Sequence, residues 1–118
     1  MNASFDTEIL DAALARRRQH QELERQSVLS QVIRGLESVG EQYGIQQAYL
    51  FGSLTRPGHF HDASDVDLAL PGPLPEDCCS FISTLSAMVG REVDLVTLDR
   101  CHFAHRIHQM GILWTKMP

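Results

Sequence analysis

The sequence has few cysteines, no long apolar run and a shortage of basic residues, and each of these excludes a class of protein. Three cysteines, two of them adjacent at Cys78 and Cys79, form no paired disulfide framework, and a reducing cytoplasm suits them best. No apolar run approaches the roughly 20 residues that a bilayer-spanning helix needs, and the N-terminus lacks a signal-peptide core. We therefore expect a cytoplasmic protein without membrane attachment. The 10 basic residues face 15 acidic ones, and the net charge of −5 argues against direct nucleic-acid binding.

The length and composition are those of one ordinary globular domain. The chain has 118 residues, of which 43% are hydrophobic and 21% are charged, and it is too short for two domains that each bury a core. We expect a single domain over residues 1–118, with a helical N-terminal arm at 1–42 and a compact core at 46–118.

The arm is predicted from a proline-free stretch. Residues 7–39 carry apolar side chains at helical spacing, which indicates one long helix or two abutting ones. Its middle, from Arg16 to Arg25, is almost entirely polar, so this part either projects into solvent or lies against a charged partner surface.

The core alternates short strands and helices. Strands are expected at 48–51, 65–70 and 92–98, and helices at 75–89 and 101–110, the second capped by Asp99. Residues 112–114 either add a strand or dock on the sheet. The order predicts an α/β (α+β) fold with a small mixed sheet covered by helices.

Three aspartates stand where apolar side chains are expected. Asp65 and Asp67 are two apart in one strand, so both point to the same face of the sheet, and Asp94 occupies a similar position in the next strand. Carboxylates this close repel each other unless a cation lies between them, and oxygen ligands suit Mg²⁺ better than zinc. Two such ions would leave a local charge of about +1, which favours a polyphosphate.

A Gly-Ser turn follows the first strand of the core. Gly52 allows backbone N–H groups to approach a phosphate closely, and the Ser53 hydroxyl can donate to the same oxygens. Alone this dipeptide is a weak signal. Followed at eleven residues by Asp-x-Asp on a strand, it becomes a much stronger one.

Together these residues resemble the DNA polymerase beta nucleotidyltransferase superfamily, and most closely its minimal nucleotidyltransferases (MNT), which are antitoxins paired with HEPN-domain ribonuclease toxins. The resemblance runs from about Phe51 to Trp114 and implies a polymerase beta-like fold. It also implies that Asp65, Asp67 and Asp94 are catalytic and bind two Mg²⁺ ions, whereas Gly52, Ser53 and Arg56 bind the nucleotide.

Two departures concern the loop after the Gly-Ser turn. The spacer is one residue longer than the commonest pattern of the family, and Pro57 replaces the glycine that often follows the arginine. The departures affect the expected role of Arg56 and leave the three aspartates unchanged.

The resemblance implies that AMP is transferred from ATP to a tyrosine hydroxyl of a nearby-encoded HEPN toxin, with which a hetero-oligomer is expected. About two dozen residues follow Asp94, so we expect the acceptor to be held mostly by the partner. Two alternatives stay open: an antitoxin that blocks the toxin by contact alone, and a nucleotidyltransferase acting on a small hydroxylated substrate.

Three histidines recur on the last predicted helix, at His102, His105 and His108. They could contact a metal or an acidic partner. Because the spacing is not a familiar zinc signature, a polar stripe that faces a partner or solvent is the preferred interpretation.

Overall fold

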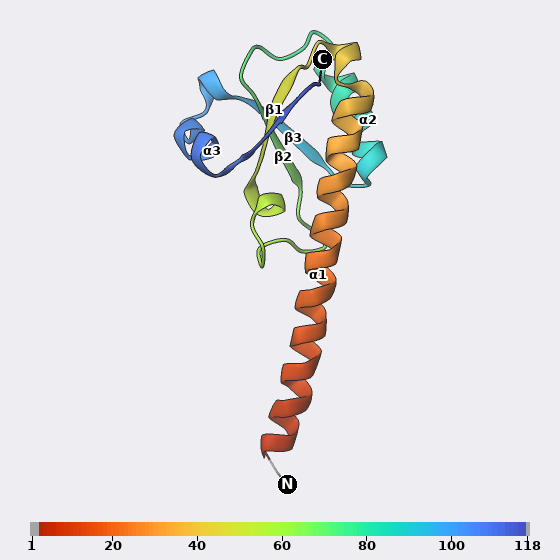
Figure 1. Ribbon diagram of the computed structural model, residues 1–118, viewed down its shortest axis with the longest axis vertical. Helices are drawn as coiled ribbons and strands as arrows, with labels where there is room; N and C mark the ends of the chain where they lie inside the picture. Colours follow the sequence, from red (N-terminus) through yellow and green to blue (C-terminus); the bar gives the residue numbers. More distant parts are fainter. Residues whose placement is uncertain (1–2, 118) are drawn as a thin grey trace.

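The computed structural model describes residues 3–117, which form a four-stranded sheet with helices on both faces (Figure 1). In chain order the elements are α1 (Ala3–Val39), β1 (Gln47–Phe51), β2 (Val66–Leu70), α2 (Cys78–Val89), β3 (Val93–Thr97), α3 (Ala104–Met110) and β4 (Ile112–Thr115). Short 3-10 helices lie between some of them: η1 (Glu41–Tyr43), η2 (Gly52–Thr55) and η3 (Leu98–Arg100). The expected fold class and the long N-terminal helix are confirmed.

The sheet is mixed, with the strand order β3-β2-β1-β4. β2 and β3 run parallel and are connected through α2, whereas β1 is antiparallel to both of its neighbours. β4 pairs with β1 from Ile112 to Thr115, so the last residues of the core add a strand rather than only docking on the sheet.

Two predicted helix starts are wrong. The second helix begins at Cys78 rather than at Pro75, because the backbone of Asp77 is not yet helical (φ −107°, ψ 48°). The third begins at Ala104 rather than at residue 101, and Asp99 lies in η3 instead of capping it. Burial of Leu98 against the sheet holds this segment in tight turns and delays the helix.

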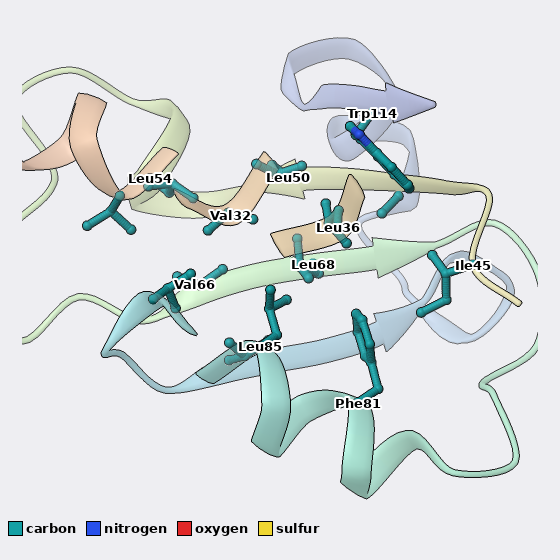
Figure 2. Close-up of a cluster of buried hydrophobic side chains, with 14 of the residues drawn as sticks. Val32, Leu36, Ile45, Leu50, Leu54, Val66, Leu68, Phe81, Leu85 and Trp114 are labelled. Atoms are coloured by element: carbon teal, nitrogen blue, oxygen red, sulfur yellow. The ribbon is translucent and has the colours of Figure 1, made fainter. Parts of the chain in front are cut away.

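One face of the sheet is covered by α1 and α2, and it carries the main hydrophobic core (Figure 2). Val32 and Leu36 of α1 and Leu85 of α2 pack on Leu50 and Leu68 of the strands, and all five are at most 1% exposed. The opposite face is covered only in part, by α3, which buries Ile107 in a smaller apolar cluster. The uncovered part of this face is where polar side chains can reach solvent.

Helix α1 has two unlike halves. From Val28 onward it buries side chains in the core, whereas residues 7–20 are all exposed and project beyond the sheet (Figure 1). Projection into solvent is confirmed for residues 16–20 of the polar stretch, whereas Arg25 at its end donates to the carbonyl oxygen of Leu54 of the same chain at 3.0 Å. Within the described residues, no helix is long and apolar enough to cross a membrane.

Candidate nucleotidyltransferase site

Two of the three predicted aspartates, Asp67 and Asp94, lie on the sheet face that α1 and α2 leave free, and Asp65 precedes Asp67 in the chain. Val66 and Leu68 of β2 are fully buried in the main core, so Asp67 between them points to the opposite face. Asp94 of β3 is the direct register partner of Asp67 across the parallel pair. Asp65 was expected inside the strand, but β2 begins at Val66 and Asp65 lies just before it.

The charges in this cluster affect one another. The pKa of Asp67 is raised from its usual 3.8 to about 6, first because the carboxyl is partly buried and then because Asp94 and Asp65 lie nearby. Among residues 7–117, whose side chains the structure describes, no lysine or arginine forms an ion pair with any of the three carboxylates. The cluster therefore has an unbalanced negative charge that a bound cation would neutralise.

The Gly-Ser turn is packed directly against this cluster. Phe51, the last residue of β1, is the register partner of Asp67, and the chain then turns into η2 at Gly52. Gly52 has φ +76°, and a Cβ atom built on it would overlap the Asp67 carboxylate. Only glycine meets both conditions, so the turn and the carboxylate are fitted to each other. Ser53 follows as a half-buried residue of η2.

A cavity of about 420 Å³ opens beside this turn, between η2 and α3. Its walls combine apolar and aromatic side chains with two arginines, and it is lined by Phe51, Gly52, Thr55, Arg56, Phe103, Arg106, Ile107, Met110 and Gly111. Arg56, which was expected to touch phosphate, is exposed at the end of η2 and lies on this cavity. The arrangement offers an apolar surface for a ring and two cations for a phosphate chain.

The family comparison agrees with this geometry. The model of the polymerase beta nucleotidyltransferase family matches residues 35–116. The chain belongs to this nucleotidyltransferase family. The matched part contains the whole sheet and the Gly52 turn, and it leaves the exposed half of α1 outside. No curated protein is significantly similar to the chain.

Sequence reasoning missed one charged residue of the nucleotidyltransferase site. Arg106 lies on α3 among histidines and gives no motif of its own. The available signal was helical spacing, because residue 106 lies about one turn after Phe103 within the helix predicted at 101–110. Only the position of α3 beside η2 shows that both residues line the same cavity as Arg56.

The residues of the nucleotidyltransferase site fit a divalent cation that is shared with a substrate. Within the described residues, no three acidic, histidine or cysteine side chains form a preformed metal cage. Mg²⁺ commonly uses one or two carboxylates and takes its other ligands from water and phosphate. The carboxylates carry an unbalanced negative charge beside a Gly-Ser turn. They therefore fit a cation that is shared with water and phosphate better than they fit a closed structural metal site.

The three histidines that were predicted on the last helix are not part of a metal cluster in the described chain. Nδ1 of His108 lies 3.2 Å from the Tyr49 hydroxyl, and the two rings meet edge to face. His102 packs its ring against Phe103. All three histidines are exposed, in agreement with a stripe that faces solvent, but His102 lies before α3 rather than on the helix.

Proposed function

We propose that the protein catalyses Mg²⁺-dependent transfer of AMP from ATP to a tyrosine hydroxyl of a HEPN-type ribonuclease toxin and neutralises the toxin in this way. The pairing of Asp67 with Asp94 on one sheet face, with Asp65 just before the strand and Gly52 packed against Asp67, carries the proposal. Within the described residues these carboxylates have no basic partner, and no structural role explains them beside strands that are otherwise mostly apolar.

The Gly52 turn binds the phosphate chain of the nucleotide, and the cavity beside it binds the base. Backbone N–H groups after Gly52 and the Ser53 hydroxyl hold the phosphate chain. The ring of Phe103 and the side chain of Met110 offer the base an apolar surface, while Arg56 and Arg106 attract the phosphates. The cavity of about 420 Å³ is of a size that suits a nucleoside.

The reaction is an in-line displacement at the α-phosphorus. The acceptor oxygen forms a bond to the α-phosphorus, the bond to the bridging oxygen breaks, and pyrophosphate leaves with that oxygen. Asp65 and Asp67, with Asp94, would hold Mg²⁺, which neutralises phosphate charge and lowers the pKa of the attacking hydroxyl. Asp94 is exposed, so it is the carboxylate that an incoming acceptor can approach and that accepts the hydroxyl proton.

A protein acceptor is supported by the surface of α1. Residues 8–20 are all exposed, and Ile9, Leu10 and Leu14 among them are 41–57% exposed. Exposed apolar side chains on a projecting helix are typical of a protein contact.

The test is the intact mass of the HEPN protein encoded nearby, after mixing with this chain and Mg²⁺-ATP. We expect a gain of whole AMP units that disappears with EDTA and with the Asp65→Asn/Asp67→Asn variant. Fragmentation then identifies the acceptor residue. A stable complex with unchanged mass under every nucleoside triphosphate would favour an antitoxin that acts by contact alone. Absence of any complex would point to a small hydroxylated acceptor.

A further inference from the structure

Arg91 occupies the turn between α2 and β3 and belongs neither to the Gly-Ser turn nor to the cavity beside it. Its side chain is only 12% exposed, although it carries a full charge. Its own backbone is fixed, because Ser86 of α2 donates a hydrogen bond of 2.6 Å to the Arg91 carbonyl oxygen. Arg91 therefore presents its guanidinium from a rigid base.

The guanidinium holds the loop that leads to Asp65. Nη1 of Arg91 lies within hydrogen-bond distance of three carbonyl oxygens: those of His61 at 3.1 Å, Asp62 at 3.3 Å and Ser64 at 2.9 Å. Nη1 carries two hydrogens, so these are shared among the three acceptors. Three carbonyl dipoles that converge on one point repel each other unless a cation lies there, and Arg91 supplies it.

Two further contacts fix the plane of the guanidinium. Its carbon lies 4.4 Å from the centre of the Phe60 ring, and Phe60 is 2% exposed. Nη2 lies 3.6 Å from the Glu24 carboxylate of α1. Stacking on an aromatic ring together with several directed donors requires a planar group, which lysine does not have.

The position of this loop determines the position of Asp65, the first of the three aspartates. Residues 61–64 form a closed turn, in which the His61 N–H donates to Oγ of Ser64 and the Ser64 N–H donates to the His61 carbonyl. Ser64 is 7% exposed, and Asp65 comes next in the chain. Asp67 is held by pairing within the sheet, whereas Asp65 precedes the paired strand and depends on the loop.

We propose that Arg91 is a positioning residue for divalent-cation binding, which acts by holding residues 61–64 so that Asp65 faces the same point as Asp67. This inference rests on the proposed function, because it assigns to those carboxylates the binding of a cation. Arg91 itself contacts neither the cation nor the nucleotide.

Mn²⁺ binding without nucleotide, followed by electron paramagnetic resonance of the free ion, tests the proposal without relying on turnover. We expect Arg91→Gln and Arg91→Lys to weaken Mn²⁺ binding about 10- to 100-fold, as losses of outer-shell partners do. The matched control Glu24→Gln keeps the three loop contacts and removes only the ion pair, so it should bind within about twofold of the wild type.

The outcomes separate the positioning role from a merely structural one. Arg91→Lys keeps the charge and most of the side-chain stem, and circular dichroism shows whether it is folded. A folded Arg91→Lys protein with wild-type Mn²⁺ affinity overturns the inference. Should Arg91→Gln fail to fold, Arg91→Lys decides alone. If the wild type binds no Mn²⁺, or if Asp67→Asn binds as well as the wild type, the proposed function itself is contradicted.

Discussion

The two faces of the sheet use the same strands for opposite purposes. On the face covered by α1 and α2, Val66 and Leu68 are completely buried and stabilise the fold. On the other face, Asp67 and Asp94 lie side by side with no described basic partner, and the pKa of Asp67 is raised to about 6. Alternate residues of β2 thus provide stability on one face and, together with Asp94 of β3, an unfavourable charge cluster on the other.

The difference between the two faces indicates where the functional residues of a small sheet are located. A buried Leu side chain contributes about 1.5–3 kcal/mol through removal from water. Grouped carboxylates oppose folding instead, and they are tolerated only where the other face supplies enough stability. Changes on the two faces should therefore separate activity from stability.

The double variant Asp65→Asn/Asp67→Asn should separate the effect on activity from the effect on stability most strongly. Loss of the charged ligands should lower the transfer rate by about a thousandfold or more, since metal assistance contributes several kcal/mol to such reactions. The melting temperature without metal should stay the same or rise, because repulsion is relieved. Rate assays by intact mass and a thermal melt measure the two quantities. A transfer rate near that of the wild type would contradict the metal assignment.

The converse change is Leu68→Ala, on the other face of β2. Leu68 is 0% exposed, and its truncation should cost about 2–5 kcal/mol of unfolding free energy. Urea unfolding measures the loss, and Asp67→Asn in the same strand is the control. Transfer measured at a temperature where the variant is folded should be nearly normal. A loss below about 1 kcal/mol would show that this face is less tightly packed than the structure indicates.

Gly52→Ala tests how closely the turn and the carboxylate are fitted. The left-handed backbone alone should cost about 1–2 kcal/mol, and the overlap with Asp67 should also reduce transfer. Gly44→Ala is the matched control, because Gly44 has a similar φ of +73° and no atom within 4 Å of the added Cβ. Both variants should lose the stability that the left-handed backbone costs, Gly52→Ala somewhat more because of the overlap, and only Gly52→Ala should lose activity. Equal activity in both would remove Gly52 from the site.

The smallest effect concerns pH. Asp67 binds its proton more tightly in the folded protein, so between pH 3.8 and about 6 the folded state carries more protons than the unfolded state. The contribution of this group to stability therefore falls as the pH rises through that window. Urea unfolding of the metal-free protein across the window should show a smaller fall in Asp67→Asn, with Asp99→Asn as the control. An identical pH dependence in wild type and Asp67→Asn would exclude this role for Asp67.

Local sequence patterns were sufficient to predict much of the fold and the candidate site. The two-residue spacing of Asp65 and Asp67 predicted a shared face, and the register of β2 and β3 places Asp94 beside Asp67. The catalytic and metal-binding roles of these residues stay predictions. Gly52 was also expected at the turn, but its contact with Asp67 was not.

What the sequence did not reveal depends on contacts between distant segments. Arg91 is 27 residues from Ser64, and no local pattern links a turn after α2 to a loop before β2. Arg106 joins the cavity only because α3 lies beside η2. The helix starts at Cys78 and Ala104 were misplaced because Asp77 has a non-helical backbone and because Asp99 lies in η3, beside the buried Leu98.

The most direct test of this account is the thermal stabilisation produced by Mg²⁺-ATP in the wild type and in Asp65→Asn/Asp67→Asn. A ligand that binds only the folded state raises the melting temperature according to its affinity. We predict that the wild type gains several degrees, whereas the variant gains none although it is at least as stable without ligand. Equal stabilisation of the two proteins would contradict the claim that the carboxylate face binds the metal and nucleotide.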